Sequence, residues 1–204
     1  MHIPVNLRKQ LDTYDVLVLP GWHNSGPDHW QSRWEQLFPA FRRVQQINWD
    51  TPRREDWIAT LDEAIAECTR PVLLIGHSLG CITIAHWARQ HQHRVAGALL
   101  VAPADVERRT VASALRRFGP IPLARLPFPA LLIGSDNDRC CTAWRSAELA
   151  DHWGAEFHLL YGAGHINADS ELGDWPEGLL LLNEWLRGVA ARKPRPWQNI
   201  VWVA

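Results

Sequence analysis

The sequence predicts an α/β fold: a single compact domain over residues 1–204, with a mostly parallel sheet that has helices on both faces. Short apolar runs, typical of strands buried on both faces of a sheet, alternate with longer segments whose apolar residues recur at helical spacing. Such alternation favours a parallel sheet covered by helices. The length of 204 residues and the hydrophobic content of 47% suit one domain with a substantial core.

The elements can be assigned in chain order from composition and periodicity. Residues 15–19 form an apolar run that Pro20 and Gly21 end, and Thr51 is predicted as a helix N-cap with Pro52 in the first turn. Asp105 is either the cap of a later helix or a site residue. The predicted strands are 15–19, 44–47, 72–75, 95–101, 130–133 and 157–161, and the predicted helices are 28–38, 51–69, 81–93, 107–117, 142–153 and 177–191.

Residues 72–80, Val-Leu-Leu-Ile-Gly-His-Ser-Leu-Gly, join a buried strand to a helix through a Gly-x-Ser-x-Gly pattern. In such a sharp turn the hydroxyl of Ser78 stands clear of the backbone, and a Cβ at Gly76 or Gly80 would collide with neighbouring elements. The pattern alone also occurs in ordinary glycine-rich turns. The strand before it and the helix after it favour a nucleophile.

An acid and a histidine follow later strands at the same predicted edge of the sheet. Ser78, Asp138 and His165 occur in the chain order serine, acid, histidine that is typical of hydrolases with a serine nucleophile. His165 is predicted to act as the general base and Asp138 to orient its ring. Asp136 is the alternative acid, but it lies closer to the turn, where a short carboxylate commonly bonds backbone N–H groups.

The motifs together resemble the α/β-hydrolase superfamily, and specifically its small serine hydrolases akin to retinoblastoma-binding protein 9. The resemblance implies a compact hydrolase without a large lid, in which Ser78, Asp138 and His165 are the catalytic triad. The chain departs from the family pattern at Arg139, where members usually have proline after the acid. The motifs that resemble the family are residues 19–22, 76–80, 101–105, 137–138 and 164–165.

Two regions are predicted to contact the substrate. The backbone N–H groups of Leu79 and of Trp22 or His23, at strand ends, are placed to stabilise an oxyanion. Trp22, His23 and the stiff loop 118–129, with Phe118 and Ile121, are predicted to border the substrate pocket. With four prolines in twelve residues, this loop could equally pack under the domain.

Composition excludes several other classes of function. A net charge of −1 and a pI near 6.8 favour neither nucleic acid nor an anionic membrane as partner. The N-terminal residues lack a signal-peptide pattern, so a cytoplasmic protein is expected. The four cysteines, including the adjacent Cys140 and Cys141, are expected to be reduced. No cofactor and no metal site are predicted.

The remaining histidines have structural interpretations. His77 points away from the nucleophile and is predicted to be structural. His86, His91 and His93 are predicted to mark a solvated helix end, because no carboxylate or cysteine lies nearby at metal-ligand spacing.

The sequence therefore predicts a serine hydrolase that cleaves a small-molecule carboxylic ester, or an amide or thioester, through an acyl-enzyme on Ser78. One alternative is a protein-binding module that keeps the fold, although the sequence indicates no protein partner. The other is a lyase or transferase on the same scaffold, since a fold does not fix the reaction.

Overall fold

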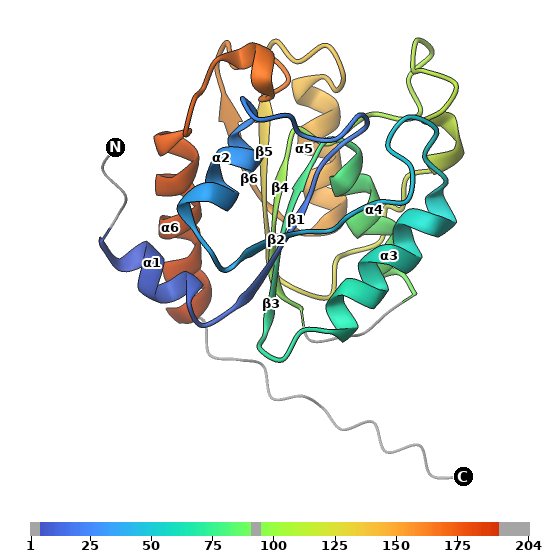
Figure 1. The fold of residues 1–204 in the computed structure, drawn as a ribbon. Coiled ribbons are helices and arrows are strands. Elements are labelled where there is room, and N and C mark those ends of the chain that lie inside the picture. The colour runs from blue at the N-terminus through green and yellow to red at the C-terminus, as the bar shows by residue number, and fades with distance from the viewer. Residues whose placement is uncertain (1–4, 91–94, 192–204) are drawn as a thin grey trace, which may run out of the picture.

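The computed structural model describes residues 5–90 and 95–191, and its centre is a six-stranded parallel sheet (Figure 1). The strand order is β2-β1-β3-β4-β5-β6, and every neighbouring pair is parallel. The strands are β1 (Asp15–Leu19), β2 (Phe41–Arg43), β3 (Val72–His77), β4 (Val95–Val101), β5 (Ala130–Ser135) and β6 (Glu156–Leu160). The predicted α/β architecture is confirmed.

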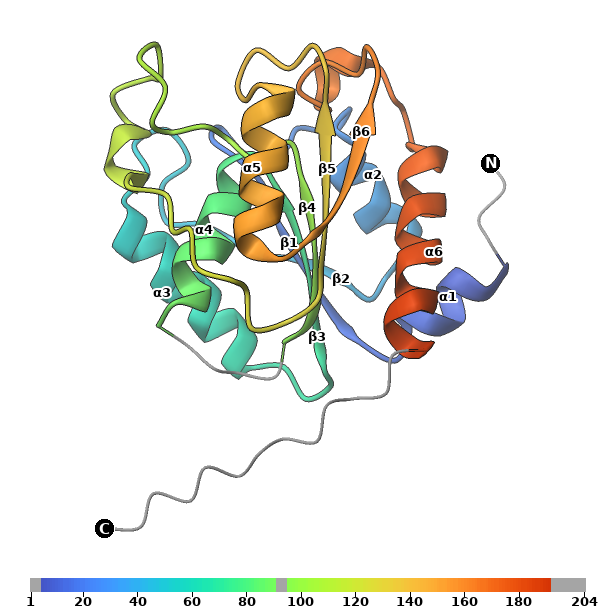
Figure 2. The ribbon, with the colours of Figure 1, turned by 180° about the vertical axis from the view of Figure 1, so that it is seen from behind.

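Helices cover both faces of the sheet, as Figures 1 and 2 show from opposite sides. On one face lie α1 (Val5–Leu11), α2 (Trp30–Leu37) and α6 (Pro176–Ala191), and on the other lie α3 (Arg54–Ala66), α4 (Leu79–Ala88) and α5 (Ala143–Trp153). None of these described helices combines the length and apolar character needed to cross a membrane.

The strand side chains alternate between two apolar cores, because successive residues of a strand point to opposite faces. In β3, Leu74 belongs to the core under α3, α4 and α5, whereas Leu73 and Ile75 belong to the core under α1, α2 and α6. Every residue of β3 is buried. This central strand therefore holds the following residue, Ser78, on a rigid support.

Two predicted element boundaries are wrong near the edge of the sheet. The second strand is Phe41–Arg43 rather than 44–47, because its ladder with β1 begins earlier and an edge strand tolerates charged residues. Helix α3 begins at Arg54, not at Thr51, because Asn48 Oδ1 accepts from the N–H groups of Asp50 and Thr51 and folds this segment into a turn.

The predicted helix 107–117 is also wrong. Asp105 Oδ1 accepts from the Glu107 N–H, successive turns follow, and the segment ends in a single 3-10 turn, Arg116–Phe118. Asp105 and Glu107 also pair with Arg145 of α5, at 3.9 and 2.5 Å. Tertiary ion pairs therefore decide the path of this segment.

Two further differences concern helix α1 and His86 of α4. Helix α1, in which Leu7 and Leu11 are buried one turn apart, was not predicted from the sequence. His86 is not solvated as predicted: its ring is buried, and Nε2 lies 2.6 Å from the Phe118 carbonyl oxygen. His91, His93 and the predicted end of that helix lie outside the described residues.

We expect Gly80→Ala to lower the free energy of unfolding by about 1–3 kcal/mol, the usual cost of overpacking. An added Cβ would lie 2.2 Å from the Leu19 carbonyl oxygen, a backbone atom that cannot move aside cheaply. This contact outweighs the ~1 kcal/mol that alanine gains over glycine in a helix.

The measurement is urea denaturation, and Gly26→Ala is the matched control. At Gly26 a Cβ would meet nothing within 4 Å, so this variant should stay within about 0.5 kcal/mol of the parent. Equal stability of the two variants would contradict the proposed close contact.

Candidate active site

The backbone of Ser78 forms a sharp turn between β3 and α4. Its φ is 54° and its ψ is −118°, a conformation that side-chain-bearing residues rarely adopt. The turn is held by the Ser78 N–H, which donates to the Val101 carbonyl at 3.0 Å, and by the Ser78 carbonyl, which accepts from the N–H groups of Cys81 and Ala104. These bonds offset the strain and aim the side chain at the edge of the sheet.

The glycines of this turn are required by close packing. An added Cβ would lie 2.8 Å from Ile84 Cδ1 at Gly76, and 2.2 Å from the Leu19 carbonyl oxygen at Gly80. The collisions expected from the sequence at both positions are confirmed.

His165 lies in a loop after β6 that is fixed by polar contacts. Gly162 and Gly164, at φ of 69° and 57°, shape the loop. The Gly164 N–H donates to Asn137 Oδ1, and the Gly162 N–H donates to Asp136 Oδ1, both at 2.7 Å. The loop therefore depends on the residues that follow β5.

Two aromatic rings hold the same loop from the other side. The Trp30 indole N–H of α2 donates to the Ile166 carbonyl at 2.8 Å, and His77 Nε2 lies 3.0 Å from the His165 carbonyl oxygen. The Trp30 ring packs against Trp175 at a centroid distance of 5.0 Å. His77 thus has the structural position expected of it.

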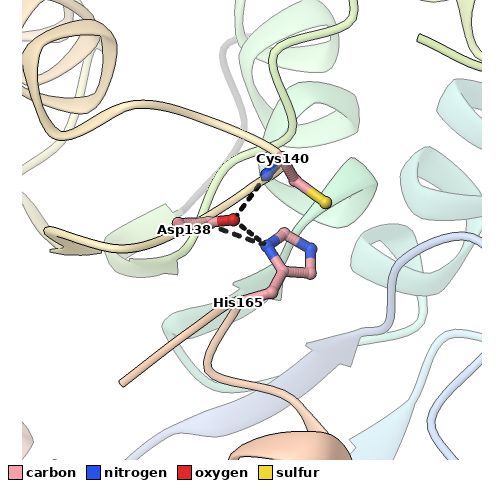
Figure 3. Close-up of side chains that lie close together, drawn as sticks. All are labelled: Asp138, Cys140 and His165. Atoms are coloured by element: carbon pink, nitrogen blue, oxygen red, sulfur yellow. Dashed lines mark hydrogen bonds and ion pairs between the residues drawn. The ribbon is translucent and has the colours of Figure 1, made fainter. Parts of the chain in front are cut away.

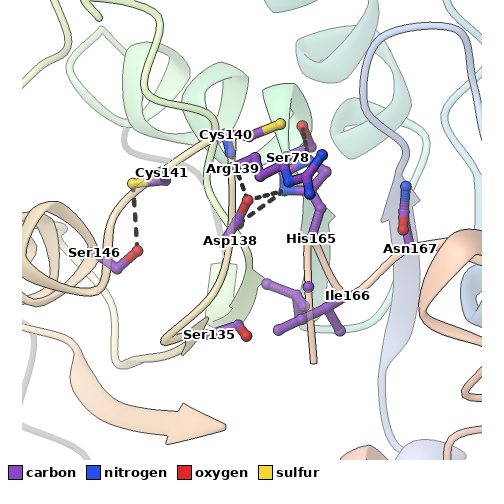
Figure 4. A network of polar contacts seen from close by, with 12 residues as sticks. Ser78, Ser135, Asp138, Arg139, Cys140, Cys141, Ser146, His165, Ile166 and Asn167 are labelled. Carbon is purple, nitrogen blue, oxygen red and sulfur yellow. Dashed lines mark hydrogen bonds and ion pairs between the residues drawn. The ribbon is translucent and has the colours of Figure 1, made fainter. Parts of the chain in front are cut away.

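The structure brings together Ser78, His165 and Asp138 in one hydrogen-bonded chain (Figure 4). His165 Nε2 lies 2.9 Å from Ser78 Oγ, and His165 Nδ1 lies 2.9 and 3.0 Å from the two Asp138 carboxylate oxygens. The Asp138 side chain is 1% exposed and that of His165 is 16% exposed. This arrangement can move a proton from the serine hydroxyl to the imidazole.

The two neighbouring carboxylates have different contacts. Asp138 Oδ1 also accepts from the Cys140 N–H at 2.7 Å, which restrains the carboxylate beside the ring. Asp136 is exposed and accepts from the Gly162 N–H, so its contact shapes the histidine loop and does not reach the imidazole.

Charge and burial shift the pKa of His165 in opposite directions. Burial lowers its pKa, but the hydrogen bond to Asp138, the Cys140 thiol and the charge of the carboxylate raise the pKa to about 9. Since Nδ1 donates to the carboxylate, Nε2 is the nitrogen left to accept a proton from Ser78.

Two neutral histidines lie behind this ring. The His77 ring is 5.0 Å from that of His165 and 4.6 Å from that of His29. Burial, with the charges of Arg43 and His165, lowers the pKa of His29 to about 3. Burial beside His29 and His165 holds the pKa of His77 well below its ordinary value. Neither ring therefore carries a charge beside His165 near neutral pH.

The first loop, after β1, approaches Ser78 closely. An added Cβ at Gly21 would lie 2.7 Å from Ser78 Cβ. The His23 N–H is engaged by the Trp49 carbonyl at 3.1 Å, whereas in the part of the chain that the structure describes no acceptor is found for the Trp22 N–H. The N–H of Leu79, the first residue of α4, has no acceptor within its helix. Trp22 and Leu79 are therefore the available backbone donors.

The predicted substrate residues occupy different environments. Trp22 is half-buried, stacks on the exposed His23 at 4.0 Å, and donates its indole N–H to the Asp50 carbonyl. Phe118 and Ile121 are buried in the core under α3, α4 and α5. The proline-rich loop therefore contributes to the core at both positions.

Several supporting residues had no recognisable motif in the sequence. Gln31 is fully buried, and its amide nitrogen donates to the carbonyls of Leu19 and Ile75 at the ends of β1 and β3, both at 3.2 Å. Arg43 donates to Asn24 Oδ1 and to the Ser25 carbonyl, which braces the first loop. Such residues can be recognised only by the burial and contacts of their polar side chains, and these are known only from the tertiary structure.

Comparisons with known proteins agree with this geometry. A family model described as serine hydrolase matches residues 16–184. A YdeN-like hydrolase from Pectobacterium atrosepticum is 32% identical, with a TM-score of 0.82 over 93% of this chain and 99% of the other. The ydeN gene product from B. subtilis is 20% identical, with a TM-score of 0.68 over 86% of this chain and 100% of the other.

A third solved structure is a thermophilic esterase from Thermogutta terrifontis, 16% identical, with a TM-score of 0.63 over 86% of this chain and 90% of the other. At this identity the likeness concerns the fold alone. No match was found among curated proteins.

We expect Asp138→Asn to lower turnover by several orders of magnitude, up to about 10⁴, because an amide favours the wrong imidazole tautomer while the fold survives. Asp136→Asn is the matched control, two residues away, and should cost about 1 kcal/mol of stability by weakening one hydrogen bond. The measurement is the rate of ester hydrolysis by both variants, with their folding checked by circular dichroism. A collapse in Asp136→Asn with near-normal Asp138→Asn would reverse the assignment.

The pH dependence of kcat/KM should follow the His165 pKa, since only the unprotonated ring can accept the Ser78 proton. We expect kcat/KM to rise about tenfold per pH unit at low pH and to level off near pH 9, where the ring loses its proton. Hydrolysis rates measured in EDTA across this range test it. A plateau already reached at neutral pH would contradict the raised pKa.

Proposed function

Because this chain belongs to the serine hydrolase family, we propose that it is a carboxylesterase with Ser78 as its nucleophile. The family match and the fold confirm the predicted membership of the α/β-hydrolase superfamily. The narrower resemblance to the small hydrolases akin to retinoblastoma-binding protein 9 stays a prediction.

The observation that supports the proposal most is the hydrogen-bonded chain from Ser78 through His165 to Asp138. A serine hydroxyl is a weak nucleophile at neutral pH, and it needs a base within hydrogen-bond reach. The distance of 2.9 Å from Ser78 Oγ to His165 Nε2 meets this requirement. We assign His165 as general base and Asp138 as the group that orients it.

In the first half-reaction Ser78 Oγ attacks the ester carbonyl carbon while His165 takes the hydroxyl proton. The carbonyl oxygen gains negative charge, and the N–H groups of Trp22 and Leu79 stabilise it. The buried Asp138 carboxylate stabilises the imidazolium that forms. His165 then gives its proton to the departing alcohol, which leaves an acyl group on Ser78.

In the second half-reaction water replaces the alcohol. His165 accepts a proton from the water, which attacks the acyl carbonyl, and the same backbone donors stabilise the second oxyanion. His165 then returns the proton to Ser78 Oγ and the carboxylic acid leaves. Each group is regenerated, so the cycle needs no cofactor.

The proposed substrate is a small-molecule carboxylic ester, with an amide or thioester as the chemically related alternatives. Several solved structures with this fold are esterases, among them the enzyme from Thermogutta terrifontis. We assign Trp22 and His23 to the mouth of the pocket, since both extend from the loop that contacts Ser78. Phe118 and Ile121 are buried in the core, so they are not assigned to the pocket.

We also propose that the enzyme works in the cytoplasm. All four cysteines are free thiols, including Cys140 and Cys141, which are adjacent in the chain. Free thiols persist where the medium is reducing.

We expect Ser78→Ala to abolish covalent labelling by a fluorophosphonate probe and to lower ester turnover by roughly 10⁴ or more, since the attacking oxygen is gone. Ser146→Ala is the control, because Ser146 is a buried serine of α5 that bonds to Cys141. Probe labelling and hydrolysis of p-nitrophenyl esters are measured on both variants. Labelling that persists in Ser78→Ala would exclude Ser78 as the nucleophile.

A further inference from the structure

The thiol of Cys140 lies beside the proposed active site but takes no part in the proposed turnover. In Figure 3 its sulfur is turned toward the imidazole of His165. The Cys140 sulfur, an Asp138 carboxylate oxygen and a His165 ring nitrogen all lie within 4.8 Å of one another. Among the described residues, 5–90 and 95–191, this is the only group of three such side chains that could hold a metal ion.

We propose that Asp138, Cys140 and His165 form a zinc-binding site and that zinc bound there inhibits the hydrolase. The binding stands on its own, whereas the inhibition rests on the function proposed above. Thiolate, imidazole and carboxylate are the ligands that zinc takes in proteins, and three protein ligands with one open position is a common arrangement.

The distances between the ring nitrogen and the carboxylate oxygens are close to those that a zinc site requires. Of the two ring nitrogens, Nδ1 is the one beside Asp138, at 2.9 and 3.0 Å from its oxygens. Tetrahedral zinc with ordinary bond lengths places a nitrogen and an oxygen ligand about 3.4 Å apart, and a nitrogen and a sulfur ligand about 3.6 Å apart. When zinc binds, the carboxylate and the ring must therefore separate by a few tenths of an ångström. The sulfur, which now lies within 4.8 Å of both, must approach the ring nitrogen to about 3.6 Å.

The burial of the three ligands leaves a route for the ion. Asp138 is buried at the base of the site, whereas Cys140 and His165 are both half-buried. Zinc can therefore enter past the thiol and the ring, and a water molecule can fill its fourth position. The Asp138 carboxylate is already held by the Cys140 N–H, so one oxygen is oriented before the ion arrives.

Zinc on Nδ1 blocks catalysis through a change of tautomer. If the ring is protonated, its Nδ1 proton leaves to solvent, and if it is unprotonated, the Nδ1 proton moves to Nε2. The Cys140 thiol releases its proton to solvent as the sulfur–zinc bond forms. Nε2, which faces Ser78 Oγ at 2.9 Å, then donates a hydrogen bond and can no longer accept the serine proton. Asp138 at the same time ceases to orient the ring.

The first measurement is zinc inhibition of ester hydrolysis by the EDTA-treated enzyme. We expect inhibition that EDTA reverses, and a half-inhibiting zinc concentration roughly 10- to 100-fold higher in Cys140→Ser. Even the loss of a residue that only hydrogen-bonds to a metal ligand lowers metal affinity by this factor. Cys141→Ser is the matched control, because its adjacent sulfur is buried and bonds to Ser146. This variant should be inhibited like the parent, each rate being compared with the same variant without metal.

The second measurement does not depend on hydrolysis. Cobalt(II) added to the metal-free protein should give a thiolate-to-cobalt absorption band in the near ultraviolet, present in Cys141→Ser and absent in Cys140→Ser. Equal zinc inhibition of the parent and Cys140→Ser, or no thiolate band in the parent, would overturn the proposal. If the parent cleaves no ester, the cobalt band still decides whether the metal site exists. Failure of the proposed hydrolase function can therefore be distinguished from failure of the proposed zinc site.

Discussion

The close approach of α4 to the end of β1 is the constraint on which the site depends. At Gly80 the helix backbone comes so near the Leu19 carbonyl that no Cβ fits, and a Cβ at Gly21 would lie only 2.7 Å from Ser78 Cβ. The first loop therefore packs closely against Ser78. A larger residue at Gly80 or Gly21 would push this loop and helix apart and displace Ser78 from its present position.

The histidine is held by a different kind of interaction. Its loop has no regular structure, and four hydrogen bonds take the place of a helix or strand. Asp136 and Asn137 accept from loop N–H groups, and the Trp30 and His77 rings bond to loop carbonyls. Backbone groups in such a loop must find partners when they are buried. The ring therefore lies where residues after β5 and residues of α2 place it.

The buried carboxylate of Asp138 gives this region two chemical properties. Beside it the imidazole becomes a stronger base, with a pKa raised to about 9 by the hydrogen bond and charge of Asp138 and by Cys140. The same carboxylate, ring and thiol are also a set of metal ligands, because proton and zinc compete for the same lone pairs. A neighbouring cysteine can therefore make a proton-transfer site sensitive to metal.

The sequence by itself determined the order of the six strands and of helices α2 to α6, and the elbow at Ser78, because these follow from local apolar runs and from glycines at fixed spacing. It also indicated that Ser78, Asp138 and His165 share one edge, since parallel strands end on the same side. Only the tertiary structure decided the start of β2, the turns after Asp105, the buried roles of Gln31 and His86 and the contacts of Arg43 with the first loop. These features depend on contacts between residues far apart in the chain, such as ion pairs and buried hydrogen bonds, which leave no periodic trace in the sequence.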